Sequence, residues 1–98
     1  MNVLTEKEIE EKLKSLSGWA FNNNSIGKEF NLKDFKSALS LLNKIGDEAE
    51  KMDHHPDLFL HSWNKLKIII STHSAGGVTQ NDFNLAKKIE EIDKWAVV

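Results

Sequence analysis

One long amphipathic stripe constrains the fold of this chain more than any other feature of its sequence. Apolar residues recur at steps of three and four along residues 35–52, and they are Phe35, Ala38, Leu39, Leu42, Ile45, Ala49 and Met52. This spacing places them on one face of an α-helix. Proline disfavours helical geometry in the residue before it, so the segment 53–56 should end the helix. We therefore expect a long central helix with Asn31 as its N-cap.

Alternating residues on both sides of this helix predict two β-hairpins. Residues 19–21 and 26–30 alternate around the polar run 22–25. Residues 58–63 have the composition of a third strand, which turns into an alternating run at 66–72. Alternation with a period of two is typical of strands that bury one face.

Two further helices should flank these hairpins. A capping box formed by Thr5 and Glu8 predicts a first helix that ends near Leu16. After the paired glycines at 76–77, Thr79 is the expected cap of a last helix. The order α-β-β-α-β-β-α favours an α+β fold in which a four-stranded antiparallel sheet carries three helices on one face. A chain of 98 residues fits one domain, 1–98.

Composition limits the partners that this chain can have. Thirteen Lys and Arg against 15 Asp and Glu give a net charge of -2, which lacks the basic excess that a phosphate backbone requires. The absence of cysteine excludes thiolate catalysis and Cys-ligated zinc. Apolar stretches such as 68–70 are far below the roughly 20 residues of a membrane span, and the chain begins without a basic and then apolar leader. We expect a cytoplasmic protein without direct contact with nucleic acid or membrane.

Three of the four histidines stand where elements end, and sites gather there more often than inside elements. His54 and His55 follow the long helix, and His73 closes the fourth strand on its polar face. An antiparallel sheet could bring all three to one end. The competing interpretation is that His54 and His55 only occupy a helix C-terminus, where a cationic side chain gains about 0.3 to 1 kcal/mol. His61, inside the third strand, is interpreted as a surface residue without a role in a site.

Metal and cofactor sites are not indicated by the spacing of these residues. Adjacent histidines diverge, and no His pair at i, i+4 is present, so zinc is disfavoured. Gly76-Gly77 precedes a helix but lacks the wider spacing of phosphate-binding loops. Asp82 has a structural interpretation as the N3 residue of the helix capped by Thr79, and Trp19 has one as a core anchor.

Four ordered motifs run through the second half of the chain. They are Glu50-Lys51-Met52-Asp53-His54-His55-Pro56, Trp63-Asn64-Lys65-Leu66, Ser71-Thr72-His73 and Gly76-Gly77-Val78-Thr79 with Asp82 and Leu85-Ala86. Together they closely resemble the pterin-4a-carbinolamine dehydratase family. Gly18-Trp19 and residues 30–35 are also similar, so the resemblance covers nearly the whole chain.

The resemblance implies an activity and a set of site residues. The implied substrate is 4a-hydroxytetrahydropterin, which loses water to give quinonoid dihydropterin during the recycling of tetrahydrobiopterin. His54, His55 and His73 would line the active site. The implied pterin-binding residues are Asp53, Ser71, Thr72 and Ser74, with Asp82 and Trp19 close by. Histidine has a pKa of about 6.5 and can carry the protons, so no metal or other cofactor is required.

The same resemblance leaves a second class of function open. Relatives with this fold also serve as dimerisation, transcription-coactivator or assembly modules, although the complete histidine set favours the enzyme. The edge strands of such a sheet invite pairing, so we expect a homodimer or homotetramer. One departure is visible: six residues separate Pro56 from Trp63, one more than is usual in the family. The extra residue predicts a bulge or a longer third strand.

Overall fold

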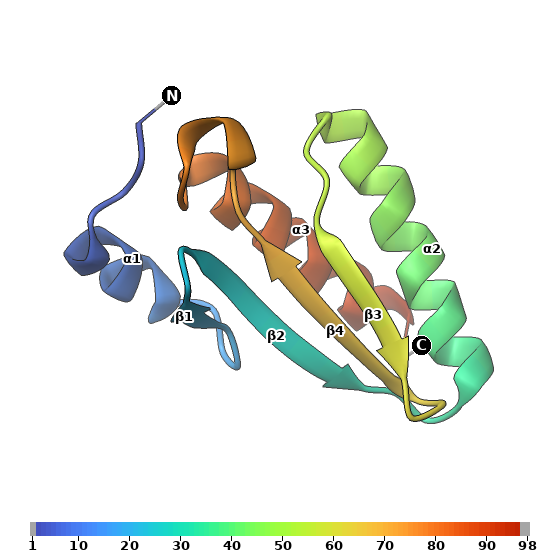
Figure 1. The fold of residues 1–98 in the computed structure, drawn as a ribbon. Coiled ribbons are helices and arrows are strands. Elements are labelled where there is room, and N and C mark those ends of the chain that lie inside the picture. The colour runs from blue at the N-terminus through green and yellow to red at the C-terminus, as the bar shows by residue number, and fades with distance from the viewer. Residues whose placement is uncertain (1, 97–98) are drawn as a thin grey trace.

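The computed structural model describes residues 2–96, which form three helices and one four-stranded sheet (Figure 1). The elements in chain order are α1 (Glu6–Leu13), β1 (Ala20–Asn22), β2 (Ser25–Asn31), α2 (Phe35–Met52), β3 (Asp57–His61), β4 (Lys65–Ile70), a short 3-10 turn η1 (His73–Ala75) and α3 (Gln80–Ala96). The predicted order α-β-β-α-β-β-α is confirmed.

Strand β4 lies inside the sheet and pairs antiparallel with β2 on one side and with β3 on the other, which gives the order β1-β2-β4-β3. Its side chains alternate as predicted: Leu66, Ile68 and Ile70 are fully buried, whereas Lys67 is exposed. The buried face carries the helices, and among the described residues no helix covers the opposite face (Figure 1). The α+β class and the antiparallel sheet are therefore confirmed.

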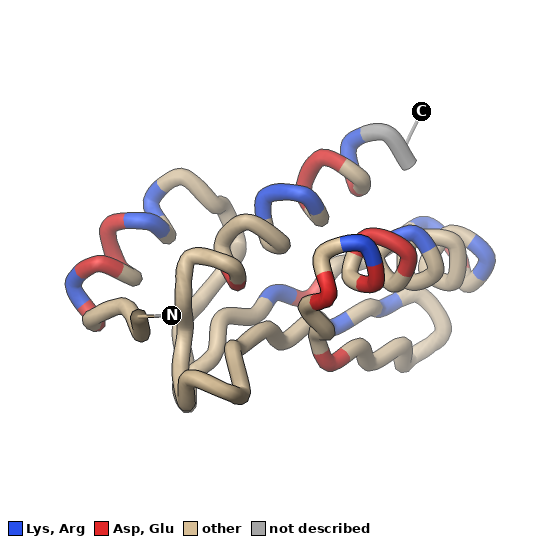
Figure 2. Tube along the Cα trace, turned by 90° about the horizontal axis from the view of Figure 1, so that it is seen from above, with Lys and Arg blue, Asp and Glu red and all other residues tan. Residues whose placement is uncertain are grey.

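Helices α2 and α3 lie side by side and contribute most of the apolar layer against the sheet (Figure 1). The residues that they bury are Ala38, Leu41, Ile45 and Ala49 of α2 and Phe83, Leu85, Ala86 and Ile89 of α3. Acidic and basic residues are interspersed along the helices (Figure 2). The predicted stripe was wrong at Phe35 and Leu39, which are 49% and 42% exposed. Leu41 continues the buried row instead, because it lies three residues after Ala38 and four before Ile45.

The start of α2 and the end of α1 differ from the predictions. Asp34, not Asn31, caps α2, and its carboxylate accepts the Ser37 backbone N–H at 2.7 Å. Asn31 is unavailable as a cap because it pairs with Lys65 as the last residue of β2. Helix α1 ends at Leu13, since the following residues tighten into i to i+3 hydrogen bonds such as Leu16 N–H to the Leu13 carbonyl.

The second hairpin is also shorter than predicted. Strand β3 ends at His61 because Ser62 and Trp63 adopt left-handed backbone angles, with φ of 50° and 59°. Pairing between β3 and β4 is unbroken from Asp57 to His61, so the predicted bulge is wrong, while the alternative of a longer strand stays a prediction. Strand β4 ends at Ile70, and beyond it Thr72 makes only an isolated bridge with Gly77.

Candidate active site

The C-terminus of α2 delivers the first two histidines to the site. Asp53 has a left-handed backbone, with φ 50° and ψ 44°, which reverses the chain after the last helical turn. Two backbone hydrogen bonds close this turn, from Asp53 N–H to the Glu50 carbonyl at 3.1 Å and from His54 N–H to the Ala49 carbonyl at 3.0 Å. This is the Schellman pattern of helix ends, in which Asp is one of the few residues other than glycine that is tolerated. The turn at Asp53 thereby fixes the position of the His54 backbone.

His54 is held by a buried carboxylate. Its Nε2 lies 2.5 Å from Oδ1 of Asp82, which comes from the first turn of α3 and is 0% exposed. The other carboxylate oxygen, Oδ2, accepts the Thr79 backbone N–H at 2.8 Å and the Thr72 hydroxyl at 3.0 Å. The cap predicted for Thr79 and Asp82 is confirmed, and the same carboxylate also orients a histidine. Asp82 therefore joins α2, α3 and the segment after β4.

The donors around Asp82 form one directional chain. Thr72 has a single hydroxyl hydrogen, which goes to the carboxylate, so the Thr79 hydroxyl must donate to Thr72 Oγ1 across their 2.8 Å contact. The Asn81 backbone N–H in turn donates to Thr79 Oγ1 at 3.3 Å. Because an ionised carboxylate only accepts, this contact favours the tautomer of His54 that carries its proton on Nε2. In the neutral form of that tautomer, Nδ1 has a lone pair that can accept a proton.

The third histidine lies on the short turn η1, which a closed loop holds in place. Thr72 N–H donates to the Gly77 carbonyl at 2.9 Å, and the Ala75 and Gly76 N–H groups both donate to the Thr72 carbonyl at 3.0 Å. His73 and Ser74 are exposed on this loop, and Ser71 is half-buried at its base. Gly76 closes the turn with a φ of 76°. The loop thus presents polar side chains while its base is buried.

Sheet pairing brings the two histidine segments to the same end of the molecule. Asp57 at the start of β3 pairs with Ile69 near the end of β4. His54 and His55 lie just before β3, and His73 lies just after β4. The predicted gathering of these three residues at one end of the sheet is therefore confirmed by the topology, and the His54 to Asp82 contact links that end to the first turn of α3.

Glu50 is a residue of this region that the sequence prediction did not single out. Its Oε2 lies 2.5 Å from Nε2 of His55, and both side chains are largely exposed. The contact spans five residues, which is not a helical spacing, and it forms because the turn at Asp53 folds the chain back over α2. His55 donates from Nε2 to the carboxylate, so its Nδ1 is also left as an acceptor.

Two further residues considered in the sequence make contacts outside the His54 and Asp82 cluster. Trp19 is 6% exposed and packs edge-on against Phe30, with ring centroids 6.4 Å apart. The predicted core role of Trp19 agrees with this packing, and its proximity to a pterin stays a prediction. His61 lies at the far end of β3 from His55 and contacts Glu29 at 2.6 Å across the uncovered face of the sheet.

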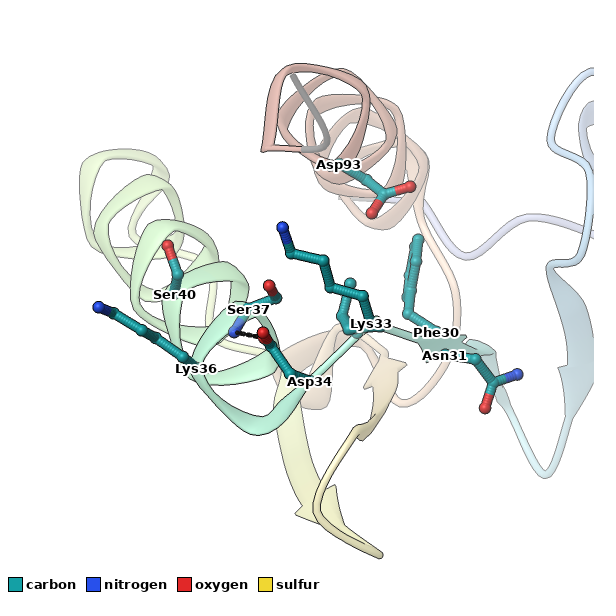
Figure 3. A pocket seen from close by; sticks show the side chains of 9 residues that line it. Phe30, Asn31, Lys33, Asp34, Lys36, Ser37, Ser40 and Asp93 are labelled. Atoms are coloured by element: carbon teal, nitrogen blue, oxygen red, sulfur yellow. Dashed lines mark hydrogen bonds between the residues drawn. The ribbon is translucent and has the colours of Figure 1, made fainter.

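A cavity of about 500 Å³ lies near the N-terminus of α2, at the other end of that helix from His54 (Figure 3). Its lining includes Phe30, Asp34, Ser37 and Asp93, but none of the predicted site residues. Burial raises the pKa of the Asp93 carboxyl, and the charge of Glu90 raises it further, while Lys28 opposes both. The placement of imidazoles and carboxylates, rather than cavity volume, therefore locates the candidate active site. Among the described residues, no group of three His, Asp or Glu side chains is arranged to hold a metal ion.

Comparison with known proteins places the chain in a family. A family model described as "Pterin 4 alpha carbinolamine dehydratase" matches residues 2–92. The chain belongs to this family. The resemblance to this family that the sequence motifs indicated is therefore confirmed over nearly the whole chain.

Curated relatives of the pterin carbinolamine dehydratase family match the chain at nearly full length. A protein of Sulfurisphaera tokodaii is 47% identical over 92 residues, which cover 94% of this chain and 98% of the relative. One of Christiangramia forsetii is 45% identical over 92 residues, covering 94% of each. Both carry the name "Putative pterin-4-alpha-carbinolamine dehydratase". This chain therefore corresponds to nearly all of each relative.

Two solved structures share the fold of this pterin dehydratase family member. A Brucella melitensis protein described as a transcriptional coactivator/pterin dehydratase superposes with a TM-score of 0.86 at 38% identity, covering 93% of this chain and 98% of its own. A pterin dehydratase-like protein identified as a RuBisCO assembly factor superposes with a TM-score of 0.62 at 11% identity, covering 76% and 84%. The second likeness concerns the fold alone. No helix among the described residues is long and apolar enough to span a membrane.

Proposed function

We propose that this protein is a 4a-hydroxytetrahydropterin dehydratase, a hydro-lyase that supports the recycling of tetrahydrobiopterin in the cytoplasm. The observation that carries the proposal is the contact between the buried Asp82 carboxylate and the His54 ring. It lies at the end of the sheet where His55 and His73 also lie. A carboxylate that orients a histidine is a common arrangement for proton transfer. Membership of the family supports a pterin as the substrate.

The reaction requires two proton transfers and no oxidation or reduction. The C4a hydroxyl leaves as water when its oxygen gains a proton and the N5 lone pair forms a double bond to C4a. The N5 proton is then lost, which gives quinonoid dihydropterin. Imidazoles, with a pKa of about 6.5, can both donate and accept protons near neutral pH.

We assign the two proton transfers to His54 and His73 and the orientation of the pterin to His55. The Asp82 contact leaves Nδ1 of His54 as the acceptor, and His73 lies on an exposed turn that solvent and substrate can reach. The exposed Asp53 and Ser74 and the half-buried Ser71 are available to bind polar edges of the pterin. Thr72 is 6% exposed and donates to Asp82, which supports an indirect role through His54.

A direct assay tests the proposal. Purified protein is mixed with enzymatically generated 4a-hydroxytetrahydropterin, and quinonoid dihydropterin is followed by absorbance. Each transfer should contribute about 10² to 10⁴-fold over the spontaneous reaction. A preparation that is folded but gives no acceleration would favour the alternative, a non-enzymatic dimerisation, coactivator or assembly module. Activity should also survive dialysis against a chelator, and loss that zinc restores would overturn the metal-free assignment.

Self-association is part of the proposed function. The sheet order leaves β1 and β3 at the edges, and an unpaired edge is a template for another strand. The exposed Phe35 and Leu39 on α2 offer a second apolar surface. These surfaces support a homodimer or homotetramer, which sedimentation equilibrium would distinguish. Direct contact with nucleic acid is not proposed, given the net charge of -2.

A further inference from the structure

Two buried threonine side chains lie behind the contact between His54 and Asp82. Thr72, which follows β4, is 6% exposed, and Thr79, which precedes α3, is 0% exposed. Their hydroxyl oxygens lie 2.8 Å apart, and Oγ1 of Thr72 lies 3.0 Å from Oδ2 of Asp82. These contacts form a chain of four side chains, which are Thr79, Thr72, Asp82 and His54.

The direction of hydrogen bonding along this chain follows from the number of hydrogens available. Each threonine hydroxyl has one hydrogen to donate. If Thr72 donated to Thr79 instead of Asp82, Oδ2 of the carboxylate would lose one of its donors. The Thr79 hydrogen would also have to leave the pair, and a buried polar group without a partner is costly. Thr79 therefore donates to Thr72, and Thr72 donates to Asp82.

Thr79 thereby acts on the Asp82 carboxylate by two routes. Its backbone N–H donates directly to Oδ2 at 2.8 Å. Its hydroxyl holds Thr72 in the orientation that donates to the same oxygen. Two donors on Oδ2 fix the plane of the carboxylate and leave Oδ1 for Nε2 of His54. A substitution that removes only the hydroxyl keeps the backbone donor, so the second route can be tested by itself.

We propose that Thr79 is a positioning residue of the active site, which acts on His54 through Thr72 and Asp82 without touching the substrate. Its hydroxyl keeps the carboxylate oriented so that the His54 ring carries its proton on Nε2. The consequence for catalysis rests on the proposed dehydratase function, but the effect on the His54 ring does not. Because the hydroxyl also accepts the Asn81 N–H at the start of α3, at 3.3 Å, stability and positioning must be measured separately.

Nitrogen NMR of the histidine rings tests the proposal without reference to activity. In alkaline buffer imidazoles are neutral, and their nitrogen chemical shifts distinguish a proton on Nε2 from one on Nδ1. Thr79→Val keeps the backbone N–H and the branched shape, so the His54 signals should move toward a mixture of both tautomers. Thr79→Ser restores the hydroxyl and should restore the signals. His61, at the far end of β3, is the internal control. Unchanged His54 signals in Thr79→Val would overturn the proposal.

Steady-state kinetics test the consequence for the reaction. Loss of one neutral hydrogen bond corresponds to about 2- to 10-fold in a rate, so Thr79→Val should lower kcat by that factor. KM should change little, because Thr79 is fully buried and does not bind the substrate. Thr79→Ser should recover kcat. A raised KM with an unchanged kcat would contradict the positioning role.

Ile89→Val is the matched control for these measurements. It shortens another fully buried side chain of α3, so it weakens the packing of the same helix without altering the chain of hydroxyls. We expect a lower melting midpoint with an unchanged kcat and unchanged His54 signals. An equal loss of kcat in Ile89→Val and Thr79→Val would show that Thr79 acts through stability alone.

A double-mutant cycle tests the route through Thr72. Thr72→Val interrupts the chain nearer to Asp82, so Thr79→Val added to it should lower kcat no further. Full additivity would show that Thr79 acts by another route, and the proposal would fail. A folded but inactive wild type, in which Thr79→Val still moves the His54 signals, would refute the dehydratase proposal alone.

The wild-type protein tests the direction of the chain if Thr79→Val does not fold. Proton NMR at low temperature detects buried hydroxyl protons that exchange slowly with water. Nuclear Overhauser contacts should place the Thr79 hydroxyl proton beside Thr72 and the Thr72 hydroxyl proton beside Asp82. A Thr72 proton directed at Thr79 would overturn the proposal.

Discussion

The imidazole of His54 and the carboxylate of Asp82 lie 2.5 Å apart, although 28 residues separate them in the chain. The contact joins the end of α2 to the first turn of α3, and Asp82 is fully buried. One carboxylate therefore caps a helix, accepts a buried threonine hydroxyl and orients a histidine. Because this carboxylate serves both the stability and the proposed catalysis, each substitution of Asp82 must be tested for its effect on unfolding and on turnover.

Replacement of Asp82 should damage the fold and the activity together. Asp82→Ala leaves the Thr79 N–H, the Thr72 hydroxyl and the His54 N–H without their acceptor, and each unsatisfied buried group costs about 1 to 3 kcal/mol. Part of this cost is relieved when water enters or hydroxyls rotate, so we expect unfolding to become easier by at least about 1 kcal/mol in denaturant titrations. Asn84→Ala, an exposed change in the same helix, is the control. An unchanged midpoint with lost turnover would show that the role of Asp82 is purely functional.

Replacement of the proposed proton carriers should remove turnover without unfolding the protein. His54→Ala and His73→Ala should each lower kcat about 10² to 10⁴-fold if they carry protons in the rate-limiting step. His73 is exposed, so its removal should cost less than about 1 kcal/mol of stability. His54 is more buried, and its removal leaves Oδ1 of Asp82 without its histidine donor, so a somewhat larger loss is expected there.

His61→Ala is the matched control for these variants. Its ring lies at the opposite end of β3, where its two nitrogens lie within hydrogen-bond distance of the exposed Glu29 and Ser62, so activity should remain near that of wild type. Strong inactivation by His61→Ala, together with an active His73→Ala variant, would require a different set of catalytic residues.

Local chemistry was sufficient to predict most of the fold. The capping box at Thr5 and the Asp82 contact with the Thr79 N–H are formed by neighbours three residues apart, so the sequence alone contains them. The N-cap of α2 was mispredicted because Asn31 and Asp34 are both good caps. The choice between them depends on the pairing of Asn31 with Lys65, a contact between distant parts of the chain.

The site was predictable as a set of residues but not as a set of contacts. The positions of His54 and His73 followed from element order and antiparallel pairing. The Glu50 to His55 contact did not, because it depends on the left-handed angles of Asp53 rather than on a helical spacing. The Asp82 to His54 contact likewise depends on how α3 packs beside α2, which no local pattern specifies.

The Asp93 carboxyl should make the free energy of unfolding depend on pH in the acidic range. Burial, and then the charge of Glu90, raise its pKa, so the folded protein binds this proton more tightly than the unfolded chain. The free energy of unfolding should therefore fall as pH rises from the ordinary carboxyl value of about 3.9 through the raised value. Asp93→Asn should have a higher melting midpoint than wild type at pH 7, and this gain should disappear near pH 3 to 4. Asp47→Asn, an equal charge change at an exposed site on α2, is the control, and an equal gain from it would contradict the argument.

The close approach of the N-terminal segment should explain why residue 77 is glycine. A Cβ built on Gly77 would lie 2.8 Å from Cγ1 of Val3, while the backbone there is not left-handed. The segment is fixed in place by the Leu4 N–H, which donates to the Val78 carbonyl at 2.8 Å. Gly77→Ala should therefore lower stability by about 1 to 3 kcal/mol through overpacking, and it should disturb the loop that carries His73. Differential scanning calorimetry and amide exchange over residues 72–78 would measure the two effects.

A double-mutant cycle separates this contact from a requirement for glycine itself. Val3→Ala should rescue Gly77→Ala, with a coupling of about 0.5 to 3 kcal/mol, because it removes the methyl group that the new Cβ would meet. Gly76 provides the control, since its φ is 76° and an added Cβ would have no atom within 4 Å. Gly76→Ala should be destabilised through backbone strain alone, by about 1 to 2 kcal/mol, and Val3→Ala should not rescue it. If Val3→Ala rescued both variants or neither, the close approach of the N-terminal segment would not be the reason for glycine at position 77.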